Sequence, residues 1–160
     1  MRSRPWTLLA TAMLLFASAL ALQQCGSAAP VGEESDQPQF KVVATVDQVM
    51  DSIVIPNAQA LWDSIVYTNA ELAASPKTDD DWYSLQMNAY AVAEAGNLLM
   101  IAPRAKDDGD WMKFSADLVT AGVDAKKAAE SKNPEKVLEI GEQVYNVCTA
   151  CHMQYIVDPE

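Results

Sequence analysis

Apolar residues recur at steps of three and four along the chain from about residue 42, and no segment shows sustained alternation with a period of two. That spacing is typical of amphipathic helices that turn one face to a core. The apolar stripes cover residues 54–72, 82–99, 111–128 and 137–147. The pattern therefore predicts an all-α chain with four amphipathic helices.

Residues that start or stop helices lie within and between these stripes. Pro56 falls inside the first stripe, and because proline lacks a backbone N–H it predicts a kink or a short break from the segment 42–53. The aspartates at 79–81 favour the start of the second helix, and Asn133-Pro134 favours the start of the fourth. Because the connections are short, consecutive helices should run antiparallel. The expected fold is an antiparallel up-down-up-down four-helix bundle.

The first 22 residues are typical of a secretory signal. Arg2 and Arg4 precede an apolar run at 8–22, whose 15 residues suit a signal peptide. A membrane-spanning helix needs about 20 residues, so an uncleaved membrane anchor is the alternative interpretation. We therefore expect an exported protein whose signal covers residues 1–22.

The processing site allows two interpretations. Ala19-Leu20-Ala21 offers small residues where a signal peptidase prefers them, which would release a soluble chain. Cys25 instead resembles the start of a bacterial lipoprotein, with the signal extending to residue 24 and a lipid attached to Cys25. Gln24 departs from the small residue expected before that cysteine. In either case residues 23–41 form a flexible acidic linker and residues 42–160 form the folded domain.

The charge balance excludes one class of partner. The chain has 22 Asp and Glu against 11 Lys and Arg, a formal net charge of -11. Nucleic-acid binding needs a basic surface, so no nucleic-acid partner is expected. Loss of Arg2 and Arg4 with the signal would take the net charge to about -13. Such an acidic surface keeps copies apart in solution, and it can attract a redox partner with a basic face.

The candidate chemistry lies near the C-terminus, in the sequence Cys148-Thr149-Ala150-Cys151-His152. This CxxCH pattern is the attachment motif of c-type haem. On a helix, residues three and four apart project from one face, so both thiols and the imidazole point the same way. The thiols can then bond to the two vinyl groups of one haem while the imidazole ligates its iron. We therefore expect one covalent haem c, held by Cys148 and Cys151, with His152 as an axial iron ligand.

Three other uses of a CxxC pair suit this sequence less well than haem attachment. A zinc site needs further ligands, but His152 is the one histidine of the chain and Cys25 lies in the leader or at its edge. A thioredoxin-like dithiol would be expected at the start of a helix, near a βαβ pattern. A disulfide between Cys148 and Cys151 would be strained within one helix. Haem attachment is the interpretation that these comparisons favour.

Two glycines, Gly96 and Gly122, lie within the second and third helical stripes. A glycine can leave room for a bound group such as haem, or it can let two helices approach closely. The sequence leaves both interpretations open, because each of them favours a residue without a side chain.

An exported four-helix bundle with a single CxxCH in its last helix resembles the cytochrome c-prime family, including its low-spin c-556 members. The resemblance covers about residues 42–157, and ordinary small cytochromes c carry the motif near the N-terminus instead. Tyr155, three residues after His152, matches an aromatic residue of the family. The family often follows it with Lys or Arg, whereas this chain has Ile156. The signal and the covalent attachment of haem together imply a protein of the bacterial periplasm, soluble or lipid-anchored. The resemblance favours a homodimer through the first two helices.

The resemblance also implies which residue faces the iron opposite His152. The first helix supplies it: low-spin members use a methionine ligand, and high-spin members use an apolar residue that leaves the position open. Met50, in the stretch 46–53, stands at or near that position. The alternative for Met50 is packing in the core, a common use of methionine. Met153 adjoins His152 and cannot reach the opposite face.

Two functions follow from these alternatives. Ligation by His152 and Met50 would complete the iron coordination and favour electron transfer with a redox partner. An open sixth position would favour a protein that binds or senses nitric oxide or carbon monoxide. The chain is not expected to be an enzyme in either case, because the sequence offers no acid–base pair or nucleophile for such a site.

Overall fold

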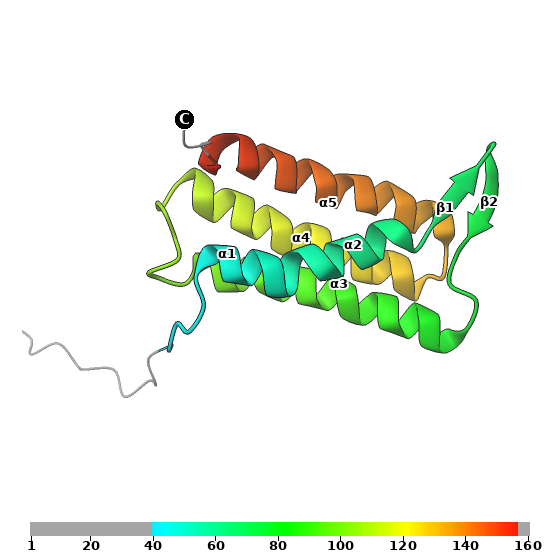
Figure 1. Ribbon diagram of the computed structural model, residues 1–160, viewed down its shortest axis with the longest axis horizontal. Coiled ribbons are helices and arrows are strands. Elements are labelled where there is room, and N and C mark those ends of the chain that lie inside the picture. Colours follow the sequence, from blue (N-terminus) through cyan, green and yellow to red (C-terminus); the bar gives the residue numbers. More distant parts are fainter. Residues whose placement is uncertain (1–39, 157–160) are drawn as a thin grey trace, which may run out of the picture. The chain divides into compact units, whose positions relative to one another are not determined.

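Helices account for about 71% of the residues that the computed structural model describes, which are residues 40–156. The long helices are α3 (Asp79–Met100), α4 (Asp110–Glu130) and α5 (Pro134–Tyr155). They are preceded by three shorter segments, α1 (Val46–Val49), η1 (Met50–Val54) and α2 (Ile55–Asp63), that follow one another directly (Figure 1). The chain is thus mostly helical, as its apolar pattern predicts.

The predicted signal at residues 1–22, Cys25 and almost all of the predicted linker 23–41 lie outside the described residues. Among residues 40–156, no helix is both long enough and apolar enough to cross a membrane. The structural description below therefore concerns the part of the chain that carries the helical stripes and the CxxCH motif.

The first helical segment, formed by α1, η1 and α2, contains a π-helical stretch. Thr45 caps its start, because its hydroxyl accepts a hydrogen bond from the Gln48 N–H (3.2 Å) and the Gln48 side chain accepts one from the Thr45 N–H (3.0 Å). Residues 50–54 are then π-helical, immediately before Pro56 in the first turn of α2. Proline lacks an N–H and crowds the preceding turn, and a wider turn accommodates both effects. The disturbance predicted at Pro56 is therefore a π-helical stretch, and the chain stays helical through it.

A β-hairpin follows where the sequence pattern predicted more helix, so that prediction is wrong for residues 64–72. Strand β1 (Val66–Thr68) pairs antiparallel with β2 (Glu71–Ala74). Asn69 and Ala70 turn the chain with left-handed φ values of 53° and 65°. Two consecutive residues of this kind are typical of a tight hairpin turn and cannot continue a right-handed helix. Thr68 and Leu72, which the stripe placed in the core, are exposed.

Two of the long helices, α3 and α5, begin with polar caps close to the predicted positions. Thr78, one residue before the predicted aspartates, is the N-cap of α3, and it exchanges hydrogen bonds with Asp81. The aspartates occupy the first turn, where negative charge is favourable beside the free N–H groups. Asn133 caps α5 by accepting from the Lys136 N–H (2.9 Å), with Pro134 next to it. The sequence therefore located these helix starts to within a residue.

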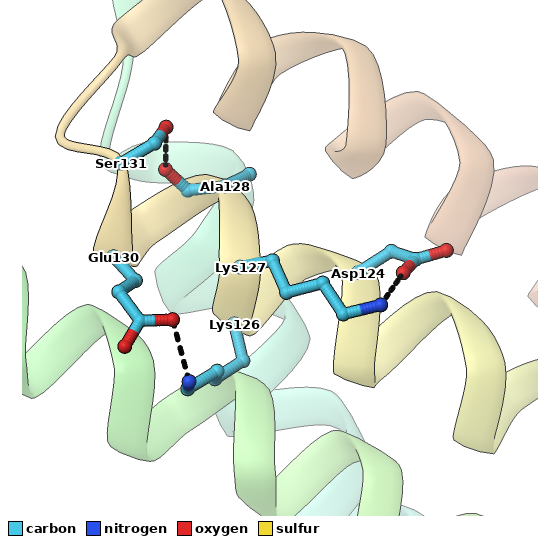
Figure 2. A network of polar contacts seen from close by, with 6 residues as sticks. All are labelled: Asp124, Lys126, Lys127, Ala128, Glu130 and Ser131. Atoms are coloured by element: carbon cyan, nitrogen blue, oxygen red, sulfur yellow. Dashed lines mark hydrogen bonds and ion pairs between the residues drawn. The ribbon is translucent and has the colours of Figure 1, made fainter.

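Figure 2 shows the last turns of α4, where polar side chains pair along the helix surface. The contacts join Lys127 to Asp124 (2.8 Å), Lys126 to Glu130 (2.6 Å) and the Ser131 hydroxyl to the Ala128 carbonyl (2.7 Å). Exposed ion pairs of this kind stabilise a fold by at most about 1 kcal/mol each. Lys132 then adopts a left-handed φ of 52°, which ends the helix.

The helices pack through the apolar faces that the stripes define. α3 packs along α4 and α4 along α5, while α2 contacts both α3 and α5. The predicted stripes supply most of the buried residues of α3 and much of those of α4 and α5. In α3 the residues both predicted and buried are Trp82, Leu85, Ala89, Val92, Gly96 and Leu99, and the structure adds Ala93 and Ala95. The core therefore lies where α2, α3, α4 and α5 meet.

Gly96 and Gly122 allow α3 and α4 to approach closely. A Cβ atom at Gly122 would lie 2.6 Å from the backbone nitrogen of Ala93, and one at Gly96 would lie 2.6 Å from the carbonyl oxygen of Ser115. Both obstacles are backbone atoms of the facing helix, and neither glycine lines the cavity described below. Of the two interpretations left open by the sequence, the structure supports close helix packing.

We expect Gly122→Ala to lower the free energy of unfolding by about 1–3 kcal/mol, because overpacking forces the facing helix backbone to shift. Gly141→Ala is the matched control. Its Cβ atom would meet Trp62 Cδ1 at an ordinary 3.4 Å, so the better helix propensity of alanine should leave stability unchanged or raise it by up to about 1 kcal/mol. Urea unfolding followed by circular dichroism measures both changes. Equal effects of the two substitutions would contradict the packing argument.

Candidate functional site

A cavity of about 550 Å³ lies between the first helical segment, α4 and the C-terminal half of α5. This volume is within the range of roughly 300–1,000 Å³ that is usual for cofactor and small-molecule sites. Four predicted site residues line it, namely Cys148, Cys151 and His152 from α5 and Met50 from η1. The remainder of the lining is largely apolar and includes Val54, Ala58, Trp62, Trp111, Phe114 and Leu118. The structure thus brings the CxxCH motif and Met50 to one apolar cavity.

The CxxCH motif occupies the second half of α5, within regular helix. Cys148 and Cys151 are free, half-buried thiols, and His152 is exposed at the edge of the cavity. Helical spacing places the three side chains on one face of α5, as the sequence predicted. Met153, next along the chain, is 83% exposed. The motif therefore presents two thiols and one imidazole to the same cavity.

Burial raises the pKa of both thiols. For Cys148 the larger cause is burial, and the neighbouring Cys151 adds to it by charge repulsion. For Cys151 burial is the cause. Redox-active dithiols of the thioredoxin type have lowered pKa values, because the thiolate is their reactive form. The apolar surroundings here act in the opposite direction and keep both groups as thiols at neutral pH.

Within the described part of the chain, the side chains form no metal site by themselves. Zinc sites commonly use three or four Cys, His or carboxylate ligands. In the stretch from residue 40 to residue 156, no group of three or more His, Cys, Asp or Glu side chains is arranged to hold a metal ion. Cys148, Cys151 and His152 likewise do not form a group that could hold a metal ion by themselves. Their side chains lie one after another along one wall of the cavity.

Met50 stands on a different wall, at the first position of the π-helical stretch. Its side chain is partly buried and packs against the hydrophobic core. The Ile55 N–H donates to the Met50 carbonyl, five residues back, as a π-helix requires. The side chains of Ser52 and Asn57 donate to the carbonyls of Gln48 and Ile53. These bonds fix the backbone that carries Met50.

Two tryptophans form aromatic walls of the cavity, one from α2 and one from α4. Trp62 donates to the carbonyl of Gly141 on α5 (2.9 Å) and meets the ring of Tyr145 edge-on at 6.0 Å. Trp111 donates to the carbonyl of Leu99 on α3 (2.8 Å). The sequence analysis did not identify either tryptophan as a residue of a cavity wall. The indole N–H groups are satisfied by distant backbone carbonyls, which no local pattern reveals.

A hydrogen bond ties the last turn of α5 to the loop before α4. The Tyr155 hydroxyl donates to the Asp107 carboxylate at 2.5 Å, and the Tyr155 ring meets Trp111 edge-on at 5.0 Å. Partial burial and the contact with Asp107 raise the pKa of Tyr155 to about 12, with a further contribution from Asp110. The same hydrogen bond is the main cause of the lowered pKa of Asp107. Asp107 was not identified from the sequence, because its partner lies far along the chain.

These pKa shifts predict how the contact responds to pH. Because the pKa of Tyr155 is raised, its stabilising effect is complete below the usual value of about 10 and is lost as the pH rises through about 12. Because the pKa of Asp107 is lowered, its stabilising effect on the fold is complete above the ordinary carboxyl pKa. That effect is lost as the pH falls through the lowered pKa. An ultraviolet titration of tyrosinate should therefore contain a component near pH 12 that Tyr155→Phe removes. Titration of Tyr155 near pH 10 would contradict the assignment.

Comparison of the chain with protein-family models, with curated proteins and with solved structures found no match. The interpretation of the cavity therefore depends on the residues that line it.

Proposed function

We propose that this chain is an exported electron-transfer protein of the bacterial periplasm that binds one haem c covalently. The observation that carries the proposal is the set of groups along one cavity: two free thiols and an imidazole from α5, and a thioether from η1. A low-spin c-type haem uses these groups, since two thiols attach it and two further ligands complete its iron coordination.

The residues of the cavity fit such a group. Cys148 and Cys151 would hold it through thioether bonds, each formed by adding a thiol S–H across a vinyl C=C bond, so that no electrons are gained or lost. His152 and Met50 would ligate its iron. The haem would supply one-electron redox chemistry when bound. The free state of both thiols is the state that this attachment requires.

The remaining lining would keep water away and hold the ligands in place. Val54, Ala58 and Leu118 are buried apolar residues of the cavity wall, and Trp62 and Trp111 are each anchored by an indole hydrogen bond. A dry, rigid site changes little when the charge of the iron changes, which favours electron transfer. Thioether ligation opposite imidazole would also raise the reduction potential.

We extend the proposal to the fold, partners and location. Helices α2, α3, α4 and α5 would form an antiparallel up-down-up-down bundle around the haem, as in the cytochrome c-prime and c-556 proteins that the sequence resembles. The chain is acidic, with a net charge of -11, and would attract a redox partner that has a basic face. The protein would be released after its signal or tethered through Cys25, would form a homodimer through its first helices, and would not act as an enzyme.

Intact-mass and optical measurements on the exported protein test the proposal. We expect the mass of the polypeptide plus one haem, and a low-spin ferrous spectrum that carbon monoxide leaves unchanged. High-spin iron that binds carbon monoxide readily would instead support the gas-binding alternative, with Met50 as a packing residue. A protein that lacks covalent haem and has both thiols open to alkylation would overturn both functions.

A further inference from the structure

One loop contacts both parts of the chain that supply the proposed iron ligands. This α3–α4 loop (residues 101–109) connects α3 to α4 and lies at the same end of the molecule as the start of α1 and the end of α5 (Figure 1). α1 leads directly into Met50, and the end of α5 carries His152. The loop is therefore placed to hold the two parts relative to each other.

Arg104 makes the contact on the side of Met50. It is a buried charged residue, with 7% of its surface exposed. Its Nε donates to the Leu98 carbonyl at the end of α3 (2.6 Å), and its Nη1 donates to the Ala44 carbonyl (3.2 Å). Ala44 directly precedes Thr45, the cap of α1. Arg104 thus links the entry of the Met50-bearing helix to α3.

Asp107 makes the contact on the side of His152. One carboxylate oxygen accepts from the backbone N–H groups of Gly109 (2.8 Å) and Trp111 (3.2 Å), which fixes the carboxylate to the start of α4. The other oxygen accepts from the Tyr155 hydroxyl (2.5 Å), in the last turn of α5. Tyr155 lies three residues after His152, almost one helical turn. Asp107 thus links the His152-bearing turn to α4.

We propose that the α3–α4 loop sets the spacing between Met50 and His152, with Arg104 and Asp107 as positioning residues. The inference builds on the proposed function. Terminal helical turns open more easily than the core of a fold. Met50 lies four residues after Val46, where α1 starts, and His152 lies three residues before Tyr155, where α5 ends. A ligand pair must be held to within about 0.5 Å, which packing of the separate helix ends does not ensure by itself. The α3–α4 loop supplies that restraint, because it is hydrogen-bonded both to the entry of α1 and to the last turn of α5.

Tyr155→Phe tests the contact on the His152 side. It removes the hydroxyl that Asp107 accepts and keeps the ring on Trp111. In the full-length protein as isolated with its haem, we expect hydrogen exchange of the amides in the last turn of α5 to rise roughly ten- to a hundredfold, the range for loss of one hydrogen bond to a charged group. Carbon monoxide binding to the ferrous protein should accelerate by a similar factor, because the Met50 position opens more often.

Tyr67→Phe is the matched control, because it also removes a hydrogen bond between a phenol and a carboxylate. The Tyr67 hydroxyl donates to Glu135 (3.2 Å) in the first turn of α5, at the opposite end of the helix. Neither the exchange of the last turn of α5 nor carbon monoxide binding should change in this variant. Equal changes in both variants would show a general loosening of α5 and would overturn the proposal.

Arg104→Lys tests the contact on the Met50 side. Lysine keeps the charge and most of the stem, but it lacks the planar fork that reaches two carbonyls. Exchange should rise for the amides of residues 45–50 and stay unchanged in the last turn of α5, which is the reverse of the Tyr155→Phe pattern. Carbon monoxide binding should again accelerate. Where a variant unfolds, the exchange pattern of the other variant still decides the question.

The outcomes separate this inference from the proposed function. If the parent protein carries low-spin covalent haem and both variants bind carbon monoxide as slowly as the parent, the positioning role is wrong and the proposed function stands. If the parent protein carries no covalent haem, the proposed function fails and the positioning role fails with it. In that case the exchange measurements still decide whether the loop holds the two helix ends.

Discussion

The double variant Cys148→Ala/Cys151→Ala is expected to contain no covalently bound haem. Both thiols are free and line the cavity, and they are the two cysteines of the described part of the chain. Without them, no thioether bond can form there. The intact mass should be that of the bare polypeptide, and acidified organic solvent should extract any haem that remains. Each single variant should retain one bond and therefore keep its haem during extraction.

Thr149→Ala is a suitable control for this experiment. Thr149 lies between the two cysteines and lines the same cavity, and its hydroxyl donates to the Tyr145 carbonyl (2.9 Å). Its substitution alters the same helical turn without removing a thiol, so haem attachment should be complete. A double cysteine variant that still gains the mass of one haem would place the attachment elsewhere and refute the assignment.

Met50→Leu is expected to convert the iron from low spin to high spin. Leucine fills nearly the same volume as methionine but has no sulfur to donate, so stability should change by less than about 1.5 kcal/mol. The vacated position should then bind carbon monoxide rapidly. Because the thioether favours the reduced iron, its loss should also lower the reduction potential. Optical and electron spin resonance spectra of both oxidation states, with and without carbon monoxide, measure these changes.

Met112→Leu provides the matched control for Met50→Leu. Met112 lies on α4, packs against the core while partly buried, and is not among the residues that line the cavity. The same chemical change at this position should leave the spin state and the carbon monoxide response unaltered. An unchanged spectrum in Met50→Leu as well would identify Met50 as a packing residue. Haem attachment should be complete in both variants, because neither affects Cys148 or Cys151.

Much of the fold follows from local patterns. The core of α3 consists of the apolar residues that recur at helical spacing from Trp82 to Leu99. The start of α5 is set by Asn133 and Pro134, which act within one turn. Helix formation and capping depend on neighbours three or four residues away, so a single stretch of sequence contains the information that they require.

The hairpin shows where local patterns are insufficient. Ile65 continues the apolar spacing of the first stripe and is buried, yet the helix ends at Asp63. The strand pairing around Asn69 and the hydrogen bond from Tyr67 to Glu135 on α5 stabilise the alternative. Glu135 is distant from Tyr67 in the sequence, so the helical spacing by itself predicted the wrong element for this segment.

The helical character of the chain and the common face of the CxxCH motif could be predicted from local pattern, because both depend on spacings of three and four residues within one helix. The family resemblance placed Met50 opposite His152 as an expectation, whereas the cavity that Met50 and the motif share, and the packing role of Gly96 and Gly122, follow from how the helices pack together. The links from Arg104 and Asp107 likewise join distant segments. Such contacts depend on how whole helices pack against one another, and that arrangement is determined by the sum of many weak, non-local interactions rather than by any single stretch of sequence.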